Sequence, residues 1–313
     1  MRLKRSSPTR KRLLQLAILM GCVLGLLFWK VDYVYEVALF NQLAHATPAT
    51  PKDSEAALFD LTTHQISRNL YIKNERSPLV FLLNGFALCD QQAKVLTRLL
   101  YFNGVKARAV PLYFQTGTSN HTIFEWFDNG RWLIADPFLH YPLNITAEEF
   151  LSLDLQFATS DYQRRLIRRA YEYYSINQDL IRELKETYAK PDHSTWEYFR
   201  DKPETRLIEW IISSPLKVWP EAYLRLLNAT YRLRHFHADP LLDRYVEARH
   251  MELLGDCKHA LEVYRSLLSM VRVTGKRDQH VFALNQGMLK SRIVSNRKHC
   301  TIDHPESSKS LFN

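Results

Sequence analysis

The chain has 313 residues, and 46% of them are hydrophobic, so it can bury a substantial core in one large or two moderate domains. Much of its formal net charge of +9 comes from the start of the chain, where six basic residues fall within the first twelve positions. The remaining sequence is only mildly basic, which argues against an extended nucleic-acid-binding surface. We therefore predict no nucleic-acid partner.

The basic residues 1–12 precede an uncharged run, residues 13–29, with the sequence LLQLAILMGCVLGLLFW. At ~1.5 Å per residue this run just spans the hydrocarbon core of a bilayer, and Trp29, Lys30 and Tyr33 are typical interface residues. We predict a transmembrane signal anchor over residues 13–31, with residues 1–12 as a cytoplasmic basic segment. The bulk of this single-pass protein would then be extracytoplasmic, with the bacterial inner membrane facing the periplasm as the favoured location.

Three alternatives for the N-terminus remain open, and a buried helix is one of them. A signal peptide could be cleaved after Ala44-His45-Ala46, but that site lies far beyond the apolar run. A lipoprotein could carry its lipid on Cys22, but seven more apolar or small residues follow that cysteine. Residues 32–54 end in AHATPATPKDS, which is rich in Ala, Thr and Pro, and this segment is predicted to be a linker.

Residues 55–146 are predicted to form an α+β domain. Helical periodicity runs through SEAALFDLTTHQISRNLY at the end of the linker, and again from Cys89 to Phe102, before Gly104. Three strand patterns follow, with the sequences ARAVPLYF, HTIFEWF and RWLIADP. Asn129-Gly130 lies between the last two and predicts a two-residue hairpin turn.

The strand signal ends near Pro142, and residues 147–295 are predicted to form an all-α domain with several proline breaks. GDCKHALEVYRSLL, residues 255–268, resembles the second helix of a tetratricopeptide repeat, and no second copy follows, so we predict one such hairpin. The arginines of YQRRLIRRAYEYY predict a solvated basic helix face, with acidic polysaccharide or anionic lipid as the alternative, functional reading. Residues 296–313 are predicted to be a flexible tail.

The residues with the clearest chemistry are Cys89, His121 and Asp136. Cys89 begins a predicted helix, and a helix N-terminus stabilises a thiolate. A hairpin that turns at Asn129-Gly130 pairs residues whose numbers add to about 259, and the numbers of His121 and Asp136 add to 257. The pattern therefore places an imidazole beside a carboxylate, as a thiol–imidazole–carboxylate triad requires.

Four ordered motifs within residues 80–141 resemble the transglutaminase-like fold, the papain-related group of thiol acyl-transferases and peptidases. They are Cys89-x-x-x-Ala93 opening a helix, GVKAR leading into a strand, HTIFEWF, and NGRWLIADP. The resemblance implies that Cys89 is the nucleophile, His121 the general base and Asp136 its orienting carboxylate. The predicted fold class is therefore α+β, with a transglutaminase-like, cysteine-protease-like domain after the transmembrane helix and before the all-α domain.

Two positions depart from the family pattern, Ala87, where a glycine is common, and Ile123, where tryptophan is frequent. Neither change removes a catalytic atom. The oxyanion hole is expected to use the backbone N–H of Cys89. A second donor is expected from one of three upstream amide side chains, which the sequence does not rank: Gln65, Asn69 and Asn84.

Other polar residues are given structural roles. Arg108 is predicted to pair with a carboxylate or a carbonyl near the start of its strand. His235 and His237 are two residues apart and do not share a helix face, and we predict no metal site and no cofactor. Cys257 and Cys300 could form a disulfide while Cys89 stays free.

These features predict a membrane-anchored extracytoplasmic thiol enzyme that acts on amide bonds of a protein or peptide substrate, with hydrolysis favoured over transfer to an amine. The alternative is an inactive transglutaminase-like scaffold. Its helical domain would then mediate protein–protein interactions in cell-envelope or exopolysaccharide assembly.

Overall fold

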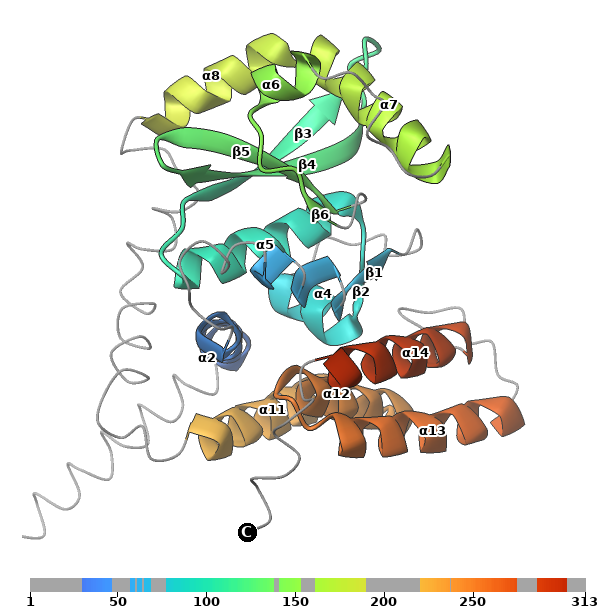
Figure 1. Ribbon diagram of the computed structural model, residues 1–313. Helices are drawn as coiled ribbons and strands as arrows, with labels where there is room; N and C mark the ends of the chain where they lie inside the picture. Colours follow the sequence, from blue (N-terminus) through green and yellow to red (C-terminus); the bar gives the residue numbers. More distant parts are fainter. Residues whose placement is uncertain are drawn as a thin grey trace, which may run out of the picture.

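The computed structural model describes residues 30–46, 57–59, 61–63, 65–68, 77–137, 141–152, 161–189, 220–236, 238–274 and 286–302. Its central element is an antiparallel sheet of four strands in the order β3 (Ala107–Tyr113), β4 (Ser119–Asp128), β5 (Arg131–Asp136) and β6 (Tyr141–Pro142). A short parallel pair, β1 (Ser67–Arg68) and β2 (Phe86–Ala87), lies apart from this sheet. The described part of the chain is otherwise mostly helical (Figure 1).

The β4–β5 hairpin turns at Asn129-Gly130, as predicted from the sequence. Both turn residues have positive φ, 47° and 80°, which is typical of a two-residue turn whose twist matches the strands. Asp128 pairs with Arg131 and Phe124 pairs with Ala135, so the numbers of paired residues add to 259. The predicted register is confirmed.

Helices cover both faces of the sheet (Figure 1). The Cys89 helix, α5 (Cys89–Phe102), packs on one face, and α6 (Ala147–Ser152), α7 (Asp161–Ile176) and α8 (Gln178–Ala189) lie over the other. The strands alternate accordingly, because successive side chains point to opposite faces. In β4, Phe124 joins the core on the α5 side and Ile123 joins the core on the α7 side.

A further layer of helices lies on the side of α5 that faces away from the sheet (Figure 1). It consists of α2 (Val31–Ala46), α4 (Pro78–Asn84), α11 (Pro220–Phe236), α12 (Pro240–Leu253), α13 (Cys257–Thr274) and α14 (Gln286–Ile302). One continuous hydrophobic core contains buried residues from all of these helices together with α5 and one face of the sheet. The helices after the sheet are therefore not a separate all-α domain, which corrects the predicted fold class.

Two predicted boundaries also change. Residues 31–46 form α2 instead of the start of a linker, and most side chains of this helix are buried, including Tyr35, Leu39 and Phe40. A helix that is apolar around most of its circumference has no amphipathic periodicity for sequence reasoning to detect. Helices α6 to α8 pack on the sheet and share a hydrophobic core with it. The predicted domain boundary at residue 147 therefore divides one packed unit.

The predicted transmembrane helix is corrected as well. Among the residues that the structure describes, no helix is both long and apolar enough to cross a membrane. The predicted span over residues 13–31 lies outside the described residues except for its last two, and Val31 belongs to α2, where it is buried in the core. The finding conflicts with the predicted fold class in this part and with the predicted single-pass location.

Helices α12 and α13 form the hairpin that the sequence predicts, with Gly255 at the turn in a left-handed conformation. Ala260 and Tyr264, the predicted packing positions, are fully buried in the shared core. Cys257 at the start of α13 is disulfide-bonded, whereas Cys89 is a free cysteine.

Candidate active site

Cys89 is the first residue of α5, and the residues before it fix where that helix begins. Gly85 ends α4 with a φ of 70°, a conformation that L side chains rarely adopt. The chain then extends to Leu88, whose backbone N–H donates to Oε1 of Gln91 at 3.0 Å. This bond is half of a capping box and defines the first turn of α5. Cys89 is half-buried there, at the positive end of the helix dipole.

His121 lies in β4, and Asp136 is the last residue of β5. The Nε2 atom of His121 is 2.7 Å from Oδ2 of Asp136, and both side chains are buried. Phe124 and Ala135 form the last pair of the hairpin before this point, so the two residues face each other diagonally at its open end. The predicted contact between the imidazole and the carboxylate is confirmed, while their roles stay predictions.

The Cys89 thiol acts electrostatically on the His121 ring, so the three predicted residues come together in one region. Because Nε2 faces Asp136, Nδ1 is the ring nitrogen on which the thiol proton can reside. Burial favours the neutral ring, but the charge and hydrogen bond of Asp136, with those of Cys89, outweigh it and raise the pKa of His121 to about 9. At neutral pH the ring is protonated, which suits a thiolate–imidazolium pair.

Helix α7 brings a residue to this point that the sequence did not predict there, Tyr173. The centroid of its ring lies 5.6 Å from that of His121 and 4.6 Å from that of Phe114. Burial raises the pKa of Tyr173; Arg169 opposes the rise, and the negative charges of Glu172 and Cys89 add to it. The hydroxyl is therefore protonated and can act as a hydrogen-bond donor.

Asn177, directly after α7, fixes the position of Tyr173. Its Oδ1 accepts from the backbone N–H of Tyr113 at 2.9 Å, and its Nδ2 donates to the carbonyl oxygen of Tyr113 at 2.8 Å. The side-chain amide thus binds the end of β3 much as a neighbouring strand would. Nδ2 also lies 2.6 Å from the carbonyl oxygen of Tyr173, so one buried amide ties this end of α7 to the sheet.

Arg108 has the structural role predicted for it. It lies opposite Glu125 across β3 and β4, and its Nε donates to Oε2 of Glu125 at 2.8 Å in a fully buried ion pair. Its guanidinium carbon lies 4.0 Å from the centroid of the Trp132 ring, a cation–π contact. Tyr174 packs near this pair, and burial, with the charges of Glu125 and Asp136, raises its pKa well above the ordinary value.

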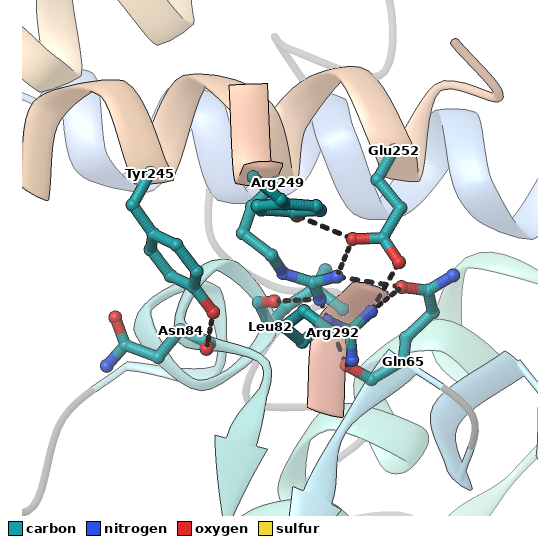
Figure 2. A network of polar contacts seen from close by, with 8 residues as sticks. Gln65, Leu82, Asn84, Tyr245, Arg249, Glu252 and Arg292 are labelled. Carbon is teal, nitrogen blue, oxygen red and sulfur yellow. Dashed lines mark hydrogen bonds and ion pairs between the residues drawn. The ribbon is translucent and has the colours of Figure 1, made fainter. Parts of the chain in front are cut away.

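The sequence predicts an oxyanion donor from one of Gln65, Asn69 and Asn84, and the structure describes two of these residues. The side chain of Gln65 is engaged by Arg249 and Arg292, and Asn84 ends α4 with its carbonyl bound to Tyr245 (Figure 2). Asn69 lies outside the described residues. Gln65 is thus not assigned to an oxyanion hole, and the side chain that the structure adds beside His121 is Tyr173, whose phenol lies within electrostatic reach of Cys89.

The histidines near residue 236 and the arginines of α7, which the sequence also singles out, are not members of the triad. His235 contacts Asp32 of α2 at 2.9 Å, and His237 lies outside the described residues. Within the described ranges, no group of three or more metal-ligating side chains comes together. On α7, Arg164 and Arg169 are exposed, and Nη1 of Arg164 lies 3.8 Å from Oδ1 of Asp161.

Comparison of this chain with models of known protein families, with curated proteins and with solved structures finds no match in any of the three.

Proposed function

We propose that the protein is a thiol enzyme of the transglutaminase-like kind that cleaves amide bonds in a protein or peptide substrate through Cys89. The single observation that carries the proposal is the convergence of three elements on one point: the start of α5 with Cys89, β4 with His121 and the end of β5 with Asp136. A structural cysteine does not require a buried imidazole whose other nitrogen is held by a carboxylate.

In the proposed reaction the Cys89 thiolate attacks the carbonyl carbon of the substrate and forms a tetrahedral oxyanion. The N–H of Cys89 and the hydroxyl of Tyr173 are the proposed donors to this oxyanion. The C–N bond then breaks as the protonated Nδ1 of His121 gives its proton to the leaving amine, which leaves an acyl thioester on Cys89. Asp136 holds the ring in the orientation that this transfer requires.

Water would release the acyl group as a carboxylic acid, with His121 accepting the water proton and the C–S bond breaking to leave the thiolate, which restores the thiolate–imidazolium pair. An amine in place of water would give a new amide. We favour hydrolysis, because nothing in the sequence indicates a dry channel for an amine acceptor.

A second candidate is an inactive scaffold that binds a protein partner through its helices. One observation favours it: α11 exposes Leu226 and Leu233 two turns apart, with 63% and 67% of their surfaces accessible. The packing of α11 to α14 into the shared core speaks against independent partner-binding helices.

Acylation by an activated ester distinguishes the two candidates. The full chain is mixed with p-nitrophenyl acetate, and the acetyl group on the Cys89 peptide is followed by mass spectrometry. An enzyme gives a rapid burst of p-nitrophenol and a transient acetyl group on Cys89, both lost in Cys89→Ala and strongly slowed in His121→Ala. A Cys89 that acylates no faster in the wild type than in His121→Ala would exclude the enzyme.

A further inference from the structure

A buried polar network joins the C-terminal helices to the chain segments that precede Cys89 (Figure 2). Its charged members are Arg249 and Glu252 of α12 and Arg292 of α14. Oε2 of Glu252 accepts from Nη1 of Arg249 and from the Tyr264 hydroxyl, each at 2.6 Å, and Oε1 accepts from Arg292. Burial would raise the pKa of Glu252, but the two guanidinium groups lower it to about 2, so the carboxylate is charged.

The charges within this network do not cancel. Two guanidinium groups share one carboxylate, so a net positive charge is buried between the helices. A buried charge is costly unless dipoles replace the water it has lost. Within the described residues, the further acceptors of Arg249 and Arg292 are oxygens of Gln65 and Leu82, which lie outside the C-terminal helices.

The first segment bound by Arg249 and Arg292 contains Gln65. Its carbonyl oxygen accepts from Arg249 and from Arg292, each at 3.0 Å, and its Oε1 accepts from the same two residues at 2.9 and 3.1 Å. The next carbonyl oxygen, that of Ile66, accepts from Nε2 of Gln92 in the first turn of α5 at 3.0 Å. Residues 67–68 then pair with residues 86–87, just before Cys89.

The last turn of α4 is the second segment. Arg249 donates to the carbonyl oxygen of Leu82 at 2.8 Å, and the Tyr245 hydroxyl donates to that of Asn84 at 2.7 Å. These carbonyls have no partner within the helix and carry the negative end of its dipole, so a guanidinium is well placed there. The fit is close at Gly85, where a Cβ atom would lie 3.1 Å from Nε of Arg249.

We propose that Tyr245, Arg249 and Arg292 are positioning residues for the nucleophile: they hold Gln65 and residues 82–85 so that α5 begins where its thiol meets His121. The inference deepens the proposed function and rests on it. The C-terminal helices then contribute to the reactivity of Cys89. If these helices detach from residues 65 and 82–85, the triad residues are still present but Cys89 is no longer aligned with His121.

The test measures two properties of the full chain, the rate of Cys89 alkylation by iodoacetamide at pH 6 and amide hydrogen exchange over residues 82–92. The variants are Arg249→Met, which removes the guanidinium, and Tyr245→Phe, a milder change that removes one hydrogen bond and keeps the ring. Circular dichroism verifies that each variant is folded. We expect alkylation to slow about tenfold or more in Arg249→Met and a few-fold in Tyr245→Phe, because small displacements of a nucleophile cost large rate factors.

Arg232→Met is the matched control. Arg232 of α11 pairs with Asp243 and Glu247 of α12, so its loss destabilises the same helix without touching the network. We expect its alkylation rate to stay within about twofold of the wild type. Combining Arg249→Met with His121→Ala should cost less than the product of the single effects, because a displaced thiol no longer depends on the imidazole.

Faster exchange over residues 82–92 in Arg249→Met or Tyr245→Phe, with slower alkylation, supports the inference. The inference is overturned if a folded Arg249→Met variant keeps the wild-type alkylation rate of Cys89 and the wild-type amide exchange over residues 82–92. If Arg249→Met does not fold, the same result in Tyr245→Phe overturns it. It is overturned equally if Arg232→Met slows alkylation as much as the network variants do. A wild-type Cys89 that reacts slowly and independently of His121 would refute the proposed function alone. The exchange data would then decide whether the network positions residues 82–92.

Discussion

His121 and Asp136 form a buried pair in which Nε2 lies 2.7 Å from Oδ2. The pair holds the pKa of His121 at about 9, so the imidazole is charged at neutral pH. Asp136→Asn removes the negative charge but keeps the shape. We expect the pKa of His121 to fall by at least about one unit in this variant, since a hydrogen-bonded carboxylate stabilises the charged ring by more than about 1.4 kcal/mol.

An NMR titration of the His121 ring protons, assigned with His121→Gln, measures this shift.

The same pair of His121 and Asp136 makes the stability of the fold depend on pH. Because the pKa of His121 is higher in the folded than in the unfolded chain, the protonated ring stabilises the fold. This stabilisation is fully present below about pH 6.5, the pKa of the unfolded chain, and is lost as the pH rises through about 9. A wild-type ring that titrates near 6.5 would contradict the electrostatics of the site.

His250 shows the opposite behaviour. Burial, aided by the charges of Arg225 and Arg232, lowers its pKa to about 4, and its Nδ1 lies 2.6 Å from the Tyr35 hydroxyl. Below about pH 6.5 the unfolded chain binds the proton first, so stability falls as the pH drops from about 6.5 to 4. Urea denaturation at pH 7 and pH 4 should show about 3 kcal/mol more loss in the wild type than in His250→Gln. Equal losses in the two proteins would refute a neutral buried His250.

Tyr173 packs against His121, and its hydroxyl is the proposed oxyanion donor; two variants separate these roles. Tyr173→Phe should keep the melting temperature within a few degrees and slow acylation of Cys89 by about tenfold, because only the proposed oxyanion donor is lost. Tyr173→Ala should cost about 3–5 kcal/mol of stability as well, since a buried aromatic ring is removed. If Tyr173→Phe acylates at the wild-type rate, the hydroxyl is not an oxyanion donor.

Arg169 lies one turn before Tyr173 in α7. Burial raises the pKa of Tyr173 and the positive charge of Arg169 opposes that rise, so this charge reaches the phenol beside His121. A positive charge attracts an anionic reagent. We expect Arg169→Gln to reduce the ratio of iodoacetate to iodoacetamide rate constants at Cys89 by about twofold at low salt, and by less at high salt. Arg182→Gln, on an exposed α8 residue paired with Asp179, is the control and should leave the ratio unchanged. If the ratio of iodoacetate to iodoacetamide rate constants is the same in Arg169→Gln and Arg182→Gln, the charge of Arg169 does not act on Cys89.

The sheet and the triad contact follow from local sequence rules. Asn129-Gly130 sets the turn, the turn sets the register, and the register brings His121 to Asp136 without information from any other part of the chain. The existence of the α5 helix is equally local, because the apolar periodicity from Ala93 to Phe102 predicts it, and Cys89 is its first residue.

The contacts that the sequence did not reveal join residues far apart in the chain. Tyr173 reaches His121 across 52 positions, and Arg249 reaches Gln65 across 184. The sequence predicts a linker where α2 lies, because a helix that is buried on most sides leaves no periodic pattern. Nothing in a single sequence distinguishes an arginine that is buried and bound to carbonyls, such as Arg249, from one on a solvated helix face, such as Arg164.

The most direct test of the central claim is the pH dependence of iodoacetamide labelling of Cys89 in the full chain, with the Cys89 peptide quantified by mass spectrometry. The comparison includes His121→Ala and Asp136→Asn, with the disulfide-bonded Cys257 as an internal reference that should not react. We predict fast labelling of the wild type already at pH 6, with labelling in His121→Ala displaced to alkaline pH and Asp136→Asn in between. A Cys89 that labels slowly at pH 6, with the same profile in all three proteins, would contradict the account.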